Sequence, residues 1–140
     1  MAGWQREHFS EELRQALAAG HVCLLGYLPD EQVAQLLAGA RALVFPSIYE
    51  GFGLPVLEAM ASGTPVVLVG HSAMPEVAGE AGNYIDADDP HGLREAMSRL
   101  IDDKTHWQAC REAGLQQAKA FSWERCAQIT ARAYRQALGG

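Results

Sequence analysis

The sequence has few cysteines and no long apolar run, and both shortages narrow the choice of protein class. The three cysteines, Cys23, Cys110 and Cys126, are odd in number and far apart, and no C-x-x-C pair occurs. This spacing argues against a disulfide framework or a zinc site and predicts a reducing compartment, by default the cytoplasm. No apolar stretch approaches the roughly 20 residues that span a bilayer, and the polar start MAGWQREHFSEEL lacks a signal-peptide core. Any contact with a membrane is therefore expected to be peripheral.

Basic residues are also scarce, because eleven Lys and Arg stand against seventeen Asp and Glu, for a net charge of -6. They are scattered along the chain and form no basic stripe, so a nucleic acid is not an expected partner. The five histidines show no metal-ligand spacing such as H-E-x-x-H, and no metal site is predicted. At 140 residues and 49% hydrophobic, the chain suits a single domain, residues 1–140.

Helical and extended patterns alternate along the chain, which predicts an α/β fold. Apolar runs predict strands at 22–26, 42–46 and 65–69, and a brief strand is predicted at 83–86. Helical spacing and capping residues, among them Ser10, Asp30 and Ser122, predict helices at 8–19, 31–40, 54–63, 89–102, 104–119 and 122–137, with a helical turn within 73–82. The strands are too apolar for either face of the sheet to be exposed to water. This indicates a Rossmann-like, three-layer parallel sheet with helices on both sides.

A glycine-rich loop in the stretch PSIYEGFGLPVLEAMASG, residues 46–63, is the candidate site. It follows a predicted strand and opens a helix, which is where open parallel sheets bind ligands. Gly51 and Gly53 let the backbone approach a ligand and adopt positive φ, and the amides at the helix start favour an anion such as a phosphate. Glu58 is then placed to accept hydrogen bonds from a neighbouring diol, and Glu50 lies across the phosphate, near the group transferred.

A plainer interpretation of these glutamates stays open. Glu58 could be only a favourable charge at a helix N-terminus, and Glu50 a solvated loop residue. Two familiar phosphate loops are excluded, since G-x-G-x-x-G would need glycine where the chain has Val56, and no G-x-x-x-x-G-K-[ST] occurs.

Four segments carry a family resemblance in their order and spacing: GYLPDEQVAQLLAGARALVFPSIYEGFGLPVLEAMASGTPVV, MPEVAGEAG, DADDPHGLREAMSRLIDD and FSWERCAQITARAY. Over about residues 10–137 the chain resembles the C-terminal domain of the group 1 glycosyltransferases (glycosyltransferase family 4, GT-B fold, retaining), including their E-x7-E motif. The resemblance implies that Glu50 contacts the donor sugar near the reaction centre and that Glu58 holds the ribose hydroxyls. It also implies a turn that frames the base, chiefly through Leu28, and backbone amides that hold phosphate and sugar: Gly51, Phe52, Gly53 and Leu54.

The resemblance further implies transfer of a hexosyl group, such as mannosyl or glucosyl, from a nucleoside-diphosphate sugar to a glycan or lipid acceptor, without a metal at the diphosphate. The chain departs from the family pattern in beginning after the second strand, so a cationic pair and the acceptor-binding N-terminal domain are expected to be absent. The fragment alone is therefore expected to be inactive. Two strands would also be missing from the parent sheet, so residues 22–26 are expected either to pair with residues 42–46 or to leave an edge that pairs with a second copy.

Two other functions remain as alternatives. A noncatalytic nucleotide-binding or assembly module is favoured by the missing cationic residues, whereas the intact E-x7-E motif favours descent from an enzyme. A GT-B epimerase acting on a sugar nucleotide is the third, and the EGFGLP loop makes it the weakest.

Overall fold

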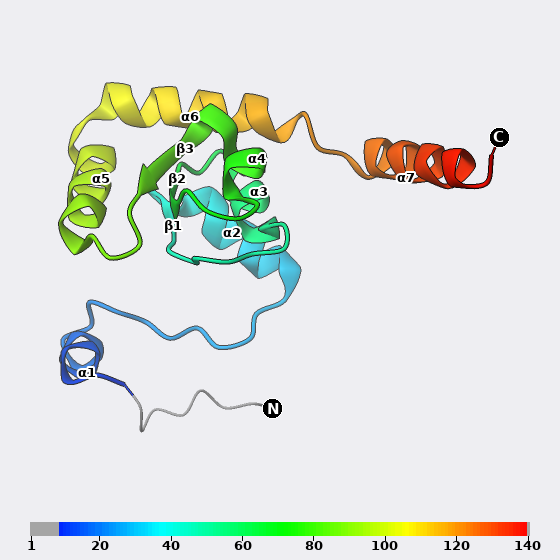
Figure 1. Ribbon diagram of the computed structural model, residues 1–140. Helices are drawn as coiled ribbons and strands as arrows, with labels where there is room; N and C mark the ends of the chain where they lie inside the picture. Colours follow the sequence, from blue (N-terminus) through cyan, green and yellow to red (C-terminus); the bar gives the residue numbers. More distant parts are fainter. Residues whose placement is uncertain (1–8, 140) are drawn as a thin grey trace.

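A computed structural model of the chain describes residues 9–139 and contains a three-stranded parallel sheet at its centre (Figure 1). The strands are β1 (Leu43–Phe45), β2 (Val66–Val69) and β3 (Gly82–Ile85), in the order β1-β2-β3. Leu43 is paired with Val66, and Val66 with Gly82. The predicted α/β alternation with parallel strands is confirmed, and three of the four predicted strands are present.

The helices fall close to the predicted ranges. They are α1 (Glu11–Ala18), α2 (Asp30–Gly39), α3 (Leu54–Ala61), α4 (Met74–Ala78), α5 (Pro90–Asp102), α6 (Lys104–Ala118) and α7 (Trp123–Ala137), with a 3-10 turn, η2, at Gly79–Ala81. Ser10 and Ser122 cap α1 and α7 as predicted, since their hydroxyls accept from the amides of Leu13 and Arg125. The predicted Asp30 cap is wrong, because Pro29 is the N-cap of α2 and Asp30 already belongs to the first turn.

The core forms around β2, all four residues of which are fully buried. Successive strand side chains point to opposite faces. Val66 and Leu68 pack into a cluster with residues of α3 and α4, including Val56, Met60 and Met74. Val67 and Val69 therefore face the other side, where α5 lies against β2 and β3. The sheet is thus the middle of three layers, as the alternation of strands and helices predicted.

The predicted strand at residues 22–26 is wrong, because this segment is irregular and pairs with no strand within residues 9–139. The side chains of Val22, Leu24 and Leu25 are exposed, and Gly26 has a φ of +67°. The prediction that the segment shifts to pair with residues 42–46 fails for the same reason. Apolar residues mark a segment suited to burial, but a strand forms only where a neighbour accepts its backbone hydrogen bonds.

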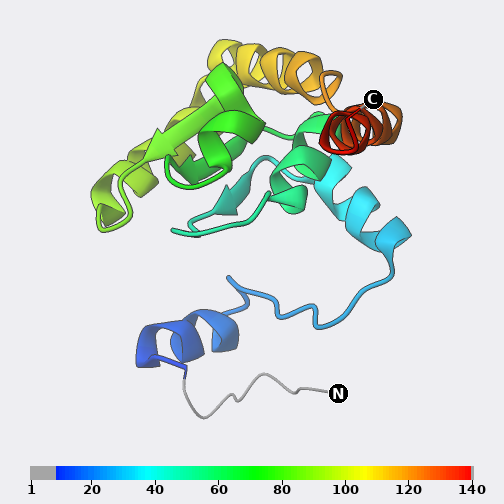
Figure 2. The same cartoon turned by 45° about the vertical axis from the view of Figure 1, so that its right-hand side comes forward.

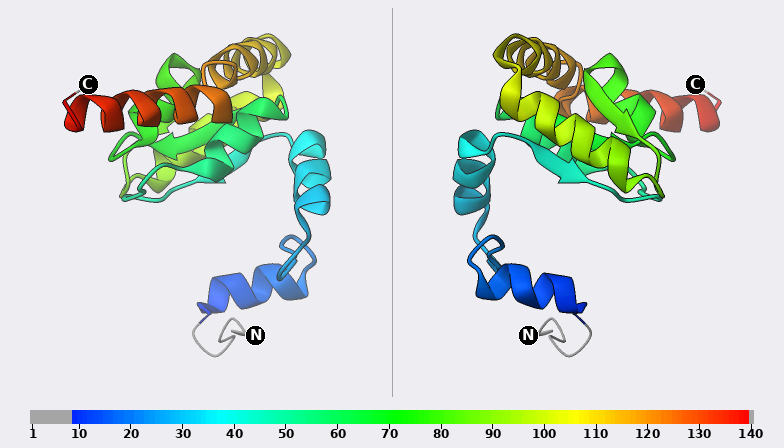
Figure 3. Two further views of the ribbon diagram at one scale, coloured as in Figure 1. Left: turned by 90° about the vertical axis from the view of Figure 1, so that its right-hand side faces the viewer. Right: turned by 90° about the vertical axis from the view of Figure 1, so that its left-hand side faces the viewer.

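Two helices extend from the compact part of the molecule. The coil at 19–29 carries α1 away from the sheet, and α7 projects on the side opposite α5 (Figures 1 and 2). No residue of either helix is buried, and Trp123 and Tyr134 of α7 are 79% and 68% exposed. Neither helix contributes to the core around β2 that positions the site (Figure 3). Within residues 9–139, no helix is long and apolar enough to cross a membrane.

Contacts of Arg41 and Trp107 hold the start of β1 against the end of α5 and the first turn of α6. The guanidinium of Arg41 lies 4.7 Å from the centroid of the Trp107 ring. It donates to the carbonyls of Leu100 and Ile101 at 2.7 and 3.1 Å, while the Trp107 indole N–H donates to the Arg41 carbonyl at 2.8 Å. The cation thus satisfies carbonyls at the end of α5, where the helix dipole also favours positive charge.

Candidate functional site

The glycine loop joins the carboxyl end of β1 to the first residue of α3, as the sequence predicts. Gly53 is the N-cap of α3 and has a left-handed backbone, with φ +94°. It is buried, and a Cβ at this position would overlap the terminal methyl of Met74. Gly51 is different, because its φ is not positive and nothing lies within 4 Å of the place where a Cβ would stand. The predicted positive φ is therefore confirmed at Gly53 and wrong at Gly51.

The backbone amides of residues 51–54 are the polar groups that the loop offers to a ligand. None of the four donates a hydrogen bond to an acceptor within residues 9–139. The Gly53 carbonyl accepts the first bonds of α3, from the amides of Val56 and Leu57 at 3.0 and 3.3 Å. Pro55, in the first turn, has no N–H to contribute. An anion beside this helix start would meet unpaired donors and the positive end of the helix dipole.

Glu50 is half-buried, and its backbone is held from the next strand–helix loop. The Ser72 hydroxyl donates to the Glu50 carbonyl at 2.6 Å and accepts from the Glu50 amide at 3.3 Å. Within the glycine loop, the Ser47 hydroxyl also donates to the Tyr49 carbonyl at 3.2 Å. The backbone from which the Glu50 side chain departs is therefore fixed on both sides.

Glu58 occupies the second turn of α3, and its side chain is exposed. Leu28 is half-exposed and precedes α2, in the coil that leads away from the sheet (Figure 3). No hydrogen bond of the described residues joins Leu28 to the glycine loop. Glu50, Glu58 and the amides of residues 51–54 thus share one loop and helix start, and the base-framing role of Leu28 stays a prediction.

Phe52 forms the outer contact of the loop. Its ring stands edge-on to that of Phe121, with centroids 6.0 Å apart and planes at 85°. Such a pair contributes about 0.5–1.5 kcal/mol beyond the area it buries. Phe121 precedes α7 by two residues, so the connection between α6 and α7 touches the candidate site.

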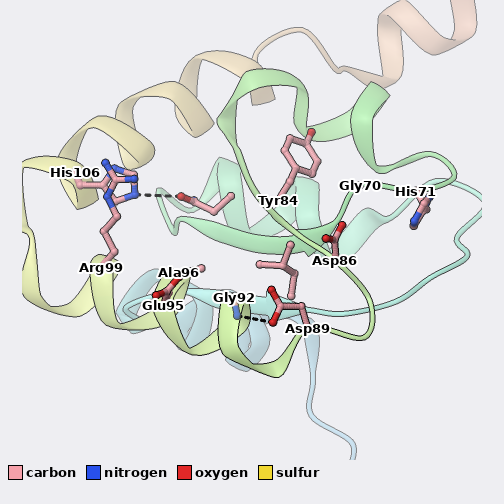
Figure 4. Close-up of a pocket in the computed structure, with 12 residues that line it drawn as sticks. Gly70, His71, Tyr84, Asp86, Asp89, Gly92, Glu95, Ala96, Arg99 and His106 are labelled. Carbon is pink, nitrogen blue, oxygen red and sulfur yellow. Dashed lines mark hydrogen bonds between the residues drawn. The ribbon is translucent and has the colours of Figure 1, made fainter.

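A separate hollow of about 650 Å³ lies beside β3 and α5 (Figure 4). Its lining carries charges of both signs, from Asp86, Asp89, Glu95 and Arg99, and none of its lining residues belongs to the glycine loop. The Tyr84 ring borders it, and burial raises the pKa of that phenol. The glycine loop, in contrast, combines unpaired amides, a helix start and the carboxylates of Glu50 and Glu58. We therefore treat the loop as the functional site.

The sequence pattern of the family described as "Glycosyl transferases group 1" matches residues 1–117. The chain belongs to this family. An O-antigen chain mannosyltransferase B from Escherichia coli is 40% identical over 133 residues, which cover 95% of this chain and 35% of that protein. An MMP alpha-(1->4)-mannosyltransferase from Mycolicibacterium hassiacum is 39% identical over 115 residues, 79% of this chain and 28% of that protein.

The fold of the family is seen directly in a solved relative. Sucrose-phosphate synthase from Thermosynechococcus elongatus, a GT-B enzyme, superposes with a TM-score of 0.80 at 31% identity, over 92% of this chain and 33% of that chain. The predicted family and GT-B fold are thus confirmed. The chain spans about a third of the length of these relatives.

Three contacts of the site were missed by the sequence analysis. Ser72, Met74 and Phe121 reach the loop from segments about 20 to 70 residues further along the chain. Ser72 is also the one non-glycine residue with positive φ among residues 9–139, at +57°. Local pattern gives no signal for such a residue, since serine prefers other backbone conformations.

Proposed function

We propose that this chain forms the donor-binding part of a retaining glycosyltransferase that moves a hexosyl group from a nucleoside-diphosphate sugar. The observation that carries the proposal is a helix start with four unpaired loop amides, between the two motif glutamates of a group 1 glycosyltransferase. The amides of residues 51–54 would hold the diphosphate and the sugar. Glu58 would accept from the ribose hydroxyls, Glu50 would contact the sugar, and Leu28 would border the base.

The proposed reaction breaks the bond between the anomeric carbon and the oxygen of the donor phosphate and forms one to the oxygen of an acceptor hydroxyl, whose proton passes to the departing diphosphate. Negative charge develops on the departing diphosphate, so donors aimed at it lower the barrier. The loop amides and the dipole of α3 supply such donors. The proposal places no metal ion at the diphosphate. Donor binding measured with and without a chelator tests this.

We assign recognition of the acceptor to the part of the relatives that this chain does not span. The chain alone would then bind a donor weakly and transfer no sugar to a glycan or lipid acceptor. The curated relatives named as mannosyltransferases make a mannosyl donor the first to test. We also propose that the protein is cytoplasmic and that any attachment to a membrane is peripheral. This part of the proposal rests on the composition alone.

A noncatalytic assembly module is the second candidate, because the sheet has an open edge. β1 pairs with β2 on one side and has no partner strand on the other within residues 9–139. The apolar segment 22–26 is exposed in the same chain. In this proposal the segment of one copy pairs with β1 of a second copy. Light scattering would then give a dimer that Leu24→Lys dissociates, and a monomer at all concentrations would contradict it.

Donor binding is tested by calorimetry of the whole chain with GDP-mannose, UDP-glucose, GDP and UDP. Replacing Glu58 by Gln removes a charged acceptor from the proposed diol contact, so we expect binding at least about tenfold weaker. Glu124→Gln is the matched control, since Glu124 is an exposed helical glutamate in α7. Equal loss in both variants, or none in Glu58→Gln, would contradict the ribose role. Absence of binding by the unchanged chain would contradict the proposal for this chain.

A further inference from the structure

Ser72 adopts a backbone conformation that its residue type avoids. Its φ of +57° lies in the left-handed region, where every other described residue with positive φ is a glycine. A side chain there crowds the following carbonyl, and such strain persists only where the surroundings hold it. Ser72 is exposed, so burial in the core does not explain it.

The strained backbone directs the Ser72 hydroxyl to the backbone of Glu50. The hydroxyl donates to the Glu50 carbonyl and accepts from the Glu50 amide, at 2.6 and 3.3 Å. The two residues are 22 positions apart and follow neighbouring strands, β1 and β2, at the same edge of the sheet. One side chain thereby satisfies both backbone groups of a candidate catalytic glutamate.

A second contact from the same segment holds the other end of the loop. The fully buried side chain of Met74, two residues after Ser72, packs against Gly53. Residues 72–74 therefore fix the loop at both Glu50 and Gly53, while the amides between them keep no acceptor within residues 9–139. Donors that are held in place but unpaired are prearranged for a ligand.

We propose that Ser72 is a positioning residue that fixes Glu50 and the amides of residues 51–53 for a sugar-linked diphosphate. The proposal rests on the donor-binding function proposed above. Ser72 acts through the Glu50 backbone and touches no reacting atom. Because Ser72 already holds the loop, less of the binding free energy would be lost on ordering the loop.

The test compares Ser72→Ala and Ser72→Gly with the unchanged chain. Both variants lose the hydroxyl, but glycine also relieves the left-handed strain. Amide hydrogen exchange is measured at Glu50, whose amide donates to the Ser72 hydroxyl, with β2 as the internal reference, and GDP-mannose binding is measured by calorimetry. Ser98→Ala is the control, because Ser98 is an exposed serine on α5.

We expect exchange of the Glu50 amide to become roughly five- to a hundredfold faster in both variants, because both hydrogen bonds between Ser72 and the Glu50 backbone are lost. Exchange in β2 should stay unchanged, and GDP-mannose binding should weaken by a similar factor. The thermal midpoint of Ser72→Gly should stay near that of the unchanged chain, which separates positioning from stability.

Unchanged exchange of the Glu50 amide in Ser72→Ala would overturn the proposal. Faster exchange with unaltered affinity would overturn it as well, since the ordering would then be irrelevant to the ligand. If the unchanged chain binds none of the nucleotides, the donor function fails and the positioning of a donor fails with it. The exchange data would in that case still report whether Ser72 holds the loop, so the two failures are distinguishable.

Discussion

Replacing Gly53 by Ala should destabilise the protein severely, although the residue lies in a loop. The added Cβ meets two separate penalties. A φ of +94° is unfavourable for any residue with a side chain, at about 1–3 kcal/mol. The Cβ also overlaps the terminal methyl of Met74, which is fully buried, and forcing extra volume into a packed core costs about 1–3 kcal/mol.

The two penalties together give a loss of roughly 2–6 kcal/mol in the free energy of unfolding. That is a large share of the about 5–15 kcal/mol typical of a domain. For a chain of this length it lowers the melting temperature by roughly 6–18 °C. Urea unfolding followed by circular dichroism measures the free energy, and a thermal scan measures the midpoint.

Gly51→Ala is the matched control, because nothing lies within 4 Å of its added Cβ and its φ is not positive. We expect it to change the free energy of unfolding by no more than about 0.5 kcal/mol. Introducing Gly53→Ala into a Met74→Ala background should remove the overlap and leave the backbone penalty. The reasoning is refuted if the two glycine substitutions cost the same, or if the Met74→Ala background leaves the cost of Gly53→Ala unchanged.

Three further predictions concern the scaffold. Arg41→Ala removes two hydrogen bonds to the end of α5 and the contact with Trp107, so urea unfolding should show a loss of about 1–3 kcal/mol; a loss below 0.5 kcal/mol would contradict this. Burial raises the pKa of Tyr84, so the stability that this residue contributes is present below the ordinary pKa near 10 and is lost as the pH rises through the folded pKa. Tyr84→Phe should abolish this loss of stability at alkaline pH, and the free energy of unfolding measured against pH would show it. The His106 amide lowers the pKa of Asp103, so stability is lost as the pH falls from about 4 through the folded pKa; Asp103→Asn should flatten this acid limb, and an equal slope in both proteins would refute it.

Local sequence signals predicted the elements that hold the site. The run at 65–69 became β2 because it is apolar on both faces and lies between two other strands. Pro55 and Gly63 bracket α3 for backbone reasons that act within a few residues. Residues 22–26 have the same apolar character but no neighbouring strand in the described part, and the prediction failed there. A strand forms only beside a neighbouring strand, and the sequence of one segment does not show whether that neighbour is present.

The loop itself was predicted from its glycines, but the residues that hold it were not. The Ser72 hydrogen bonds join positions 22 residues apart, and the contact of Phe52 with Phe121 joins positions much further apart. Such contacts arise from the order of strands and the path of the connections, which appear only in three dimensions. The assignment of Glu50 and Glu58 to a donor is proposed from the family motif, and the Glu58→Gln titration tests the part of Glu58.

The edge-on contact of Phe52 with Phe121 links the glycine loop to the root of the projecting helix α7. A surface that bound the exposed side of α7 and also restrained the Phe121 ring would narrow the positions open to Phe52. Binding at α7 and binding at the loop would then be thermodynamically coupled, and each would strengthen the other by the same factor where both favour the same arrangement of the two rings. A partner that never touches the donor would in this way tune its affinity.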